Sequence, residues 1–354
     1  MGTVRLTPAT LLEPTQQIFA AKFCPRGKFL IGGGHDARVH CWKVGDLEFA
    51  PLEPLSGHHG WVSALGCDGD GSRLFTADSW GELKAWSLNA ETPEPLWRVP
   101  EAHDGWIREV AVSPDGGTVA TCGRDRAVRL WAAADGNPKS DLSPHDADVL
   151  TLAFHPDGRS VVSGDLHGKV RQSDLKTGSV AREFDAGELF MEHRLQEVGG
   201  ARKLCFSAAG DLLAVAGTRP KNGGNVQGVP VILLFSWETG QITQTIELGA
   251  TSDVFVTDLV FHPDGALLVT TSGNPGTGQV MMVNTDDGKP FLTEKKLANC
   301  HGLSLHPNGR HLAVTATNKG SNGNGRRLDD EGNYAGNWSP IQLFDITPAD
   351  DTSS

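Results

Sequence analysis

The chain has 354 residues, of which 38% are hydrophobic and 21% are charged, and its formal net charge is −12. That acidic balance argues against a protein that binds nucleic acid or an anionic membrane, because phosphate recognition needs a basic surface. No run of 18 apolar residues is present, so the sequence predicts no membrane span.

The first residues, MGTVRLTPATLLEP (1–14), lack the basic and apolar regions of a secretory signal, so we expect a cytoplasmic protein. The six cysteines are widely spaced, without a CxxC pair, and lie in or beside strand-like runs: Cys24, Cys41, Cys67, Cys122, Cys205 and Cys300. We expect buried free thiols, since a metal or redox cluster would need ligands brought together from different repeats.

A turn that ends in glycine recurs seven times along the chain. The turns are CPRG (24–27), DGDG (68–71), SPDG (113–116), HPDG (155–158), SAAG (207–210), HPDG (262–265) and HPNG (306–309). An alternating apolar run precedes each turn, and two further runs follow it. The last run ends at Trp42, Trp86, Trp131, Ser173, Phe235, Val283 or Phe344. The histidines of these turns are expected to be structural.

Each repeat therefore predicts several short strands with period-two patterning, separated by tight turns. A small sheet cannot bury both faces alone, whereas sheets arranged radially cover one another and close a ring. The predicted fold is all-β, a single seven-bladed β-propeller of four-stranded antiparallel blades spanning 1–348. The units run approximately over 17–46, 57–90, 102–135, 144–178, 198–240, 251–288 and 297–348.

Residues 103–131, HDGWIREVAVSPDGGTVATCGRDRAVRLW, resemble one unit of the Trp-Asp (WD) repeat family of β-propellers. The resemblance implies a hydrogen-bonded set across the blade, formed by His103, Thr121, Asp125 and Trp131. Such a set fixes the tight turn between two strands against the blade core.

By the same spacing, only this third unit has the complete set. The second unit keeps His58, Thr76 and Trp86 but has Trp80 at the aspartate position. The fourth has His145 and Ser163, then His167 and Ser173, and the first keeps Asp36 and Trp42. Units five to seven retain only the alternation and the turn.

The two ends of the chain are expected to meet. Little sequence follows Phe344 that could form an outer strand of the seventh blade, and TVRL (3–6) can supply that strand. This pairing would leave no open sheet edge. ADDTSS (349–354) is expected to be a disordered tail.

The last three units carry insertions between their second and third strands. From turn glycine to unit end, the first four units take 15 residues, and the last three take 25, 18 and 35. The extra residues lie in 217–230, which includes Arg219, in 273–279, and in 319–340. A further excess at 184–200 contains ELFMEHRLQE, which could form one or two helical turns. In a four-stranded meander these four insertions share one face, over blades five to seven.

The insertion KGSNGNGRRLDDEGNYAGNWSP (319–340) is one candidate binding element. Arg326, Arg327, Tyr334 and Trp338 belong to residue types that are enriched in binding hot spots. A tolerated glycine-rich insertion remains the alternative. A calcium loop built from LDDEGN would lack the usual alternating acidic spacing.

The residues that begin the first strand of each unit form a second candidate site. They are Gln17, Trp61, Trp106, Asp148, Gly200, Phe255 and Asn299, and we call them the mouth residues. In the resembling propellers this ring faces the top surface near the central channel, where peptides often bind. Two adjacent tryptophans beside Asp148 predict an apolar docking patch, unless neighbouring loops simply half-bury them.

Signatures of catalysis are absent from the sequence: it has no P-loop, GxSxG or HExxH motif. The favoured hypothesis is a non-catalytic platform for a protein or peptide partner, without cofactor or metal, in which the ring itself is a monomer. A basic partner would suit the acidic chain. The alternative is a propeller-type, lactonase-like hydrolase, which would need acids, bases or metal ligands converging in the central funnel.

Overall fold

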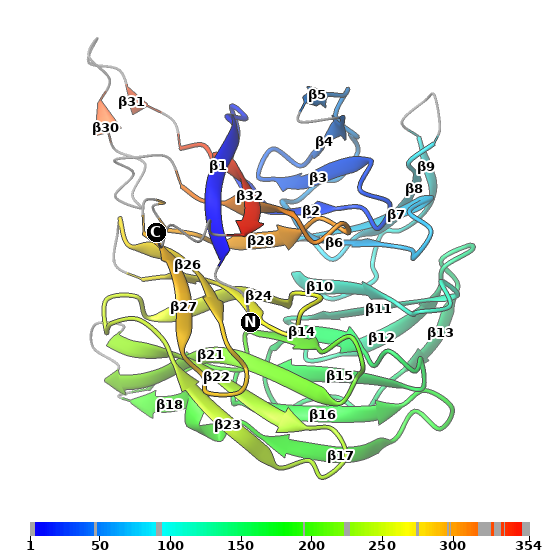
Figure 1. Cartoon of the computed structure of the whole chain (residues 1–354). Coiled ribbons are helices and arrows are strands. Elements are labelled where there is room, and N and C mark those ends of the chain that lie inside the picture. The colour runs from blue at the N-terminus through cyan, green and yellow to red at the C-terminus, as the bar shows by residue number, and fades with distance from the viewer. Residues whose placement is uncertain are drawn as a thin grey trace.

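Seven four-stranded antiparallel sheets form the body of the computed structural model, which confirms the predicted β-propeller (Figure 1). The structure describes residues 4–45, 48–89, 94–193, 195–222, 227–273, 276–295, 297, 299–317, 327–328, 334–335 and 337–348. Among these residues, no helix is long and apolar enough to cross a bilayer.

Six blades are formed by consecutive strands. Blade one contains β2 (Ile18–Phe23), β3 (Phe29–Gly34), β4 (Val39–Val44) and β5 (Phe49–Pro51). Blade two contains β6 (Val62–Cys67), β7 (Arg73–Asp78), β8 (Leu83–Ser87) and β9 (Pro95–Val99). Blade three contains β10 (Ile107–Val112), β11 (Thr118–Gly123), β12 (Val128–Ala132) and β13 (Pro138–Asp141). Blade four contains β14 (Val149–Phe154), β15 (Ser160–Asp165), β16 (Lys169–Asp174) and β17 (Val180–Asp185). Blade five contains β20 (Lys203–Phe206), β21 (Leu212–Asn222), β22 (Gln227–Ser236) and β23 (Ile242–Glu247). Blade six contains β24 (Phe255–Phe261), β25 (Leu267–Ser272), β26 (Gly278–Val283) and β27 (Pro290–Glu294).

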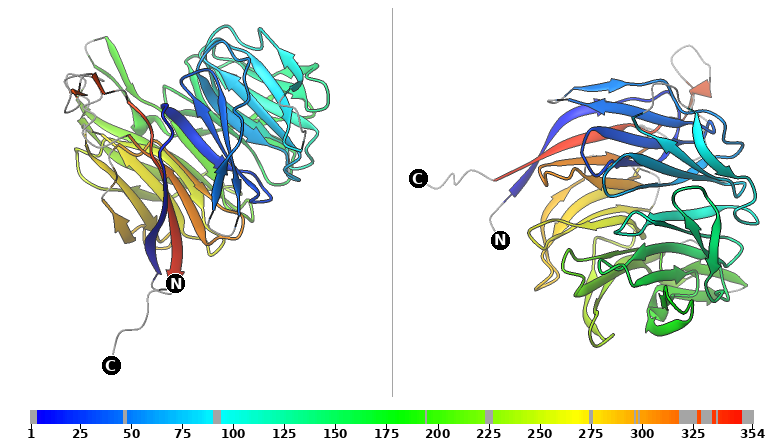
Figure 2. Two further views of the ribbon diagram at one scale, coloured as in Figure 1. Left: turned by 90° about the horizontal axis from the view of Figure 1, so that it is seen from above. Right: turned by 90° about the vertical axis from the view of Figure 1, so that its right-hand side faces the viewer.

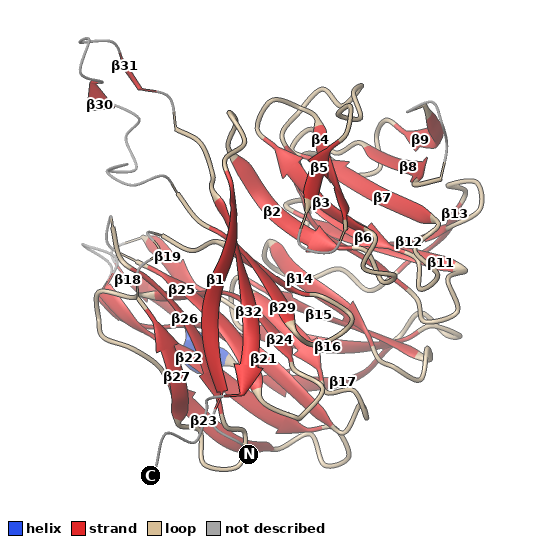
Figure 3. Ribbon diagram, turned by 45° about the horizontal axis from the view of Figure 1, so that its top comes forward, coloured by secondary structure: helices blue, strands red, loops and turns tan. Residues whose placement is uncertain are grey.

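Blade seven is built from both ends of the chain. It contains β28 (Gly302–Leu305), β29 (His311–Thr315), β32 (Ile341–Pro348) and β1 (Val4–Leu12). The first strand pairs antiparallel with the last, and Figures 2 and 3 show them side by side. The predicted closing strand at 3–6 is therefore confirmed, and it continues further, to Leu12. The expected tail at 349–354 lies outside the described residues.

The inner strands are buried on both faces because each blade packs between two others. Every residue of β11, β15 and β26 is buried, whereas the outer strand β13 is fully exposed. The hydrophobic clusters cross blade boundaries: one joins Phe75 of blade two to Val110 and Trp131 of blade three. Inter-blade packing of this kind supplies the core.

Histidines of the repeated turns connect neighbouring blades. Nε2 of His155 lies 3.0 Å from the carbonyl oxygen of Gly210, the turn glycine of the next blade. His262 reaches Gly309 in the same way at 2.9 Å. His306 reaches Gly27 at 3.2 Å, across the junction where blade seven meets blade one. These contacts give the turn histidines a structural role.

The polar set of blade three forms as the resemblance implies. His103 contacts Asp125 at 2.8 Å and Thr121 at 2.7 Å, and the Trp131 indole donates to Thr121 at 2.8 Å. Burial would raise the pKa of Asp125, but hydrogen bonds from His103 and Arg129 hold it well below its usual range.

The expectation that blades two and four lack the aspartate was wrong. In blade two, His58 contacts Asp78 at 3.0 Å and Thr76 at 2.6 Å. In blade four, His145 contacts Asp165 at 2.9 Å and Ser163 at 2.8 Å. In both blades the carboxylate comes from the last residue of the second strand, two positions before the site where the third blade carries Asp125. Trp80 is instead 69% exposed.

Of the helical turns expected at 188–197, the structure has only a short one at the start of the segment. A single 3₁₀ turn, η1 (Gly187–Leu189), leads into a hairpin of β18 (Phe190–His193) and β19 (Gln196–Gly199). Leu195 occupies the hairpin turn with a positive φ of 62°, and Val198 is buried while its neighbour Glu197 is exposed. Antiparallel pairing from Phe190 with Gly199 to His193 with Gln196 establishes that this segment is a hairpin rather than a helix.

The insertion at 217–230 extends the β21–β22 ribbon of blade five beyond the sheet. Pairing continues out to Asn222 and Gln227, and η1, β18 and β19 pack against β21. Within 319–340, β30 (Arg327–Leu328) pairs with β31 (Tyr334–Ala335), and Figure 3 draws both apart from the blades. The remaining residues of 318–336 lie outside the described part of the chain.

Substitution of Gly27 tests the junction between the last and first blades. Its φ is +68°, and an added Cβ would overlap the His306 imidazole. We expect Gly27→Ala to lower the free energy of unfolding by about 1–2 kcal/mol for the left-handed backbone, plus about 1–3 kcal/mol for overpacking. Gly178 has a φ of +71° with nothing within 4 Å of such a Cβ, so Gly178→Ala measures the backbone cost alone. Equal losses for the two variants in chemical denaturation would show that the His306 contact contributes nothing.

A second pair of variants tests the polar set of blade two. We expect Asp78→Ala to cost about 1–3 kcal/mol of unfolding free energy, because it leaves the buried His58 without its partner. Trp80→Ala should change stability by less than about 0.5 kcal/mol, since that side chain is exposed. Thermal and chemical denaturation would measure both, and the reverse ranking would contradict the assignment of Asp78.

Candidate functional site

The mouth residues of the first four blades occupy equivalent places. In each, a backbone amide in the loop after the second strand donates to the carbonyl of the mouth residue: His35 to Gln17, Ser79 to Trp61, Arg124 to Trp106 and Leu166 to Asp148. These bonds are 2.9–3.0 Å long. The second-to-third-strand loop and the start of the first strand therefore lie at the same end of each blade, as the meander predicts.

An aromatic patch covers the mouth of blades one to three. We define it as Phe19, His35, Trp61 and Trp106. The ring centroids of Trp61 and Trp106 are 5.9 Å apart in an edge-to-face arrangement, and Phe19 lies 6.0 and 5.8 Å from them. His35 stacks on Phe19 at 4.1 Å and on Trp61 at 4.9 Å. Trp61 is 45% exposed, so the patch presents apolar surface to solvent.

A β-bulge follows the mouth residue in blades one to four and in blade six. The bulged residues are Phe19, Ser63, Arg108, Leu150 and Thr257. Counted from the mouth residue, Arg202 and His301 hold the same position in blades five and seven. Bulges re-aim side chains, and they are over-represented beside functional sites.

Polar bulge residues commonly bridge to the next blade. Ser63 donates to the carbonyl of Ile107 at 2.7 Å, and Thr257 donates to the carbonyl of Cys300 at 3.0 Å. Nε2 of His301 lies 2.7 Å from the carbonyl oxygen of Ile18. In each case the acceptor is the residue that directly follows the next mouth residue.

Two arginines at the bulge position behave differently, because they lie over aromatic rings. The guanidinium carbon of Arg108 is 3.9 Å from the ring centroid of Trp106, and that of Arg202 is 4.3 Å from the ring centroid of Phe255. Asp148, the mouth residue of blade four, raises the pKa of Arg108 and so opposes the effect of burial. Three of the predicted mouth residues thus interact with the two arginines: Trp106 and Asp148 with Arg108, and Phe255 with Arg202.

The other predicted binding residues lie elsewhere. Arg219 forms ion pairs with Glu188 and Glu247 on blade five, which ties the inserted η1 to the extended ribbon. Trp338 is half-buried just before β32. Arg327 and Tyr334 fall in β30 and β31, and Arg326 lies outside the described residues. The predicted binding residues therefore fall into two groups, one at the mouth of the channel and one in the insertions.

The central channel holds a charged triad. Glu109 lies 3.3 Å from the Lys22 ammonium and 2.5 Å from that of Lys203, in a cavity of about 270 Å³ that Asp258 also lines. Burial would raise the pKa of Glu109, but the two ammonium groups lower it. A general acid or base works best with a pKa near the operating pH, so this shift disfavours such a role for Glu109.

One buried cluster has the spacing of a metal site: His58, Asp78 and Glu82. Both ring nitrogens of His58 contact the polar set, and Lys84 Nζ lies 3.1 Å from Glu82. Glu82 is therefore already paired with a cation, the ammonium group of Lys84. The cluster is part of the structural network of blade two.

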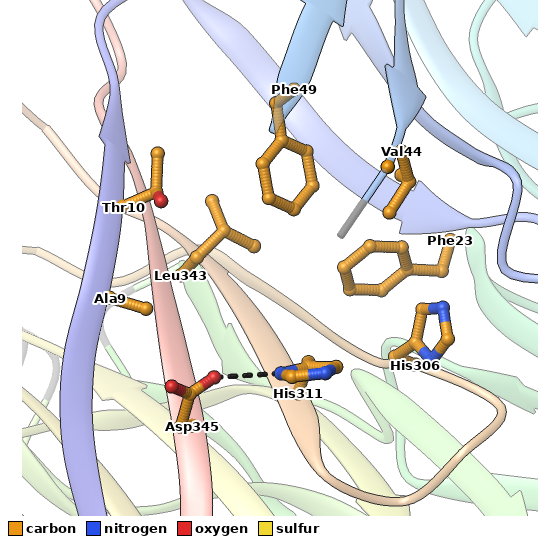
Figure 4. A pocket seen from close by; sticks show the side chains of 10 residues that line it. Ala9, Thr10, Phe23, Val44, Phe49, His306, His311, Leu343 and Asp345 are labelled. Carbon is orange, nitrogen blue, oxygen red and sulfur yellow. Dashed lines mark hydrogen bonds and ion pairs between the residues drawn. The ribbon is translucent and has the colours of Figure 1, made fainter. Parts of the chain in front are cut away.

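A small pocket lies at the junction of the last and first blades (Figure 4). Phe23 and Phe49 of blade one face Leu343 and the His311–Asp345 pair of blade seven, whose atoms are 2.7 Å apart. Its volume of about 30 Å³ suits one water molecule rather than an organic ligand.

The sequence analysis did not identify four residues that lie beside the mouth residues: Phe19, His35, Arg108 and Arg202. Three occupy the bulge position, two residues after a mouth residue, so counting from the mouth residues could have found them. His35 is the loop residue that bonds to Gln17. No signal in the sequence identifies His35, because its position beside Phe19 and Trp61 depends on the conformation of that loop.

Comparison with known proteins agrees with the geometry of the ring. The family described as "WD domain, G-beta repeat" matches residues 7–43, 49–87, 95–132, 136–173 and 240–276, more than half of the chain.

Three curated relatives are similar over parts of their length. Protein HIR1 of Kluyveromyces lactis is 24% identical over 260 residues, which cover 63% of this chain and 29% of that protein. The periodic tryptophan protein 2 homolog of Schizosaccharomyces pombe is 23% identical over 257 residues, covering 67% of this chain and 29% of that protein. Protein HIR1 of Phaeosphaeria nodorum is 23% identical over 344 residues, covering 86% and 32%. The chain spans about a third or less of the length of these relatives. Its repeats, its blade geometry and the family match together show that the chain belongs to the WD40 repeat family.

Proposed function

We propose that the chain is a non-catalytic interaction platform that docks a protein or peptide partner at the mouth of its channel. The observation that carries this proposal is the exposed aromatic patch of Phe19, His35, Trp61 and Trp106, in which tryptophan rings from two blades meet. Tryptophan dominates binding hot spots because it buries much surface and loses little rotamer entropy. Membership of the WD40 family supports the same class of function.

The insertions over blades five to seven form the second part of the proposed docking face. The Arg219 ion pairs with Glu188 and Glu247 hold the blade-five ribbon against η1. Gly276 and Thr277 of the blade-six insertion bond to Asn299, the mouth residue of blade seven, at 3.1 and 2.8 Å. These contacts attach the insertions to the ring, and loops on a rigid scaffold often carry binding residues. In this proposal the ring acts as a monomer in the cytoplasm, without a nucleic-acid or membrane partner.

A lactonase-like hydrolase is the weaker alternative. It would need a reactive acid, base or metal set in the funnel. Glu109 is a buried carboxylate of the described channel, and two lysines neutralise it, while Asp258 of the same cavity accepts a hydrogen bond from the Leu303 amide. The mouth offers apolar surface and arginines, which suits binding better than acid–base chemistry.

The proposal predicts that Trp61→Ala combined with Trp106→Ala weakens partner binding without unfolding the ring. A hot-spot side chain contributes about 2 kcal/mol or more, so loss of even one of the two would lower affinity by at least about 30-fold. The measurement is capture of partners by the tagged chain from native lysate, followed by titration of the captured partner. Trp80→Ala is the matched control, because Trp80 is exposed and lies outside the patch. Unchanged capture by the double variant would remove the patch from the site.

The insertion at 319–338 is tested by replacing it with a short Gly-Ser turn. We expect the variant to fold, since β29 and β32 pair directly with each other, and to lose part of the captured partner set. Quantitative mass spectrometry of the two captures, after matched melting temperatures, measures the effect. An unchanged partner list would make the insertion a tolerated one.

A further inference from the structure

The two arginines at the bulge position have buried donors without acceptors. Nε of Arg108 and Nε of Arg202 have no hydrogen-bond partner, and neither side chain forms a salt bridge with the residues that the structure describes. The buried Nε1 of Trp106, directly beneath Arg108, is also unsatisfied. Buried polar groups are normally hydrogen-bonded, so an orphaned group calls for an explanation.

In blades three and five, the side chain two residues after the mouth residue does not bond to the backbone carbonyl of the next blade. Ser63, Thr257 and His301 each reach the backbone carbonyl of the next blade. Arg108 and Arg202 instead lie over the rings of Trp106 and Phe255, and within the described residues their Nε–H groups donate to no acceptor.

Both arginines remain charged at neutral pH. Burial lowers the pKa of Arg108, and repulsion from Arg124 adds to the effect, while Asp148 opposes it. Burial and repulsion from Arg108 lower the pKa of Arg202 to about 10. Arg124 and Arg202 therefore both lie near enough to Arg108 to repel it or be repelled by it, and Asp148 offsets part of that repulsion. An isolated buried charge is costly unless something pairs with it.

We propose that the mouth binds a protein segment with an acidic side chain beside an apolar one, the carboxylate lying on Arg108 and Arg202 and the apolar group on the aromatic patch. Carboxylates match the planar donor fork of a guanidinium, and pairs of this kind are strong when desolvated. This inference rests on the proposed function and names the chemistry of its partner. It replaces the basic partner that the net charge of −12 suggested, because Arg108 and Arg202 form no salt bridge with the described residues.

The test uses the full chain and three blocked dipeptides: N-acetyl-Phe-Glu-amide, its uncharged Phe-Gln match, and the Phe-phosphoserine form. Binding is measured by NMR from the indole N–H signals of Trp61 and Trp106. We expect the Glu probe to bind at least about tenfold more tightly than the Gln probe, since a charged hydrogen bond contributes more than a neutral one. Added salt should reduce that preference.

Arg108→Gln and Arg202→Gln should each reduce the ratio of affinities for the Glu and Gln probes. Arg182→Gln is the matched control, because Arg182 also lies over aromatic rings, Phe184 and Trp237, but on the outer strand of blade four. The salt and probe comparisons on the unmodified chain need no substitution, so they stand even if a variant fails to fold.

The outcomes separate this inference from the proposed function. Equal affinity for the Glu and Gln probes would overturn the acidic partner and leave the aromatic platform intact. A Glu preference that survives both arginine substitutions would overturn the assigned residues. Much tighter binding of the phosphoserine probe would replace the carboxylate segment with a phosphorylated one. If the Glu probe binds but the double tryptophan variant captures every partner normally, the platform proposal fails while the anion site stands.

Discussion

Every blade of this protein depends on its neighbours to cover its two apolar faces. Because the inner strands are buried on both sides, a missing neighbour would expose a whole sheet face to water. The ring therefore has to close, and it does so through two kinds of contact at one junction. Strand β1 completes the sheet of β28, β29 and β32, while His306 reaches the turn glycine of blade one. The aromatic patch beside this junction contains residues from blade one, and its geometry rests on the same closure.

Periodicity made the fold readable from the sequence, because strand patterning and turn glycines are local features. The polar sets were less readable. The spacing of blade three places the aspartate in the turn, yet blades two and four supply Asp78 and Asp165 from the end of the preceding strand. A carboxylate in the turn or at the end of the strand before it can reach the equivalent histidine of its blade. Position in a repeat therefore does not identify the partner unless the turn geometry is known.

At the mouth, too, some residues can be identified from local sequence patterns, whereas others can be identified only from the packed structure. Trp61 and Trp106 could be aligned from the turns, and the structure brings their rings together. Arg108 lies two residues after Trp106, where a bulge changes the direction of the side chain, and Arg202 holds the equivalent position two residues after Gly200. Nothing in a single sequence marks a bulge, so their shared environment emerges only from the packed ring. Net charge is a poor guide to a single site for a related reason, since it sums charges over the whole surface.

Closure by the two ends also sets an order in time. On a ribosome that adds about 5–20 residues per second, the first strand emerges roughly half a minute before its partner. Until Ile341–Pro348 are made, Val4–Leu12 have no strand beside them, and the nascent ring has two open edges. Formation of the last blade must therefore follow synthesis of β32, and the pairing of residues more than 300 apart in sequence is expected to be a late event of folding.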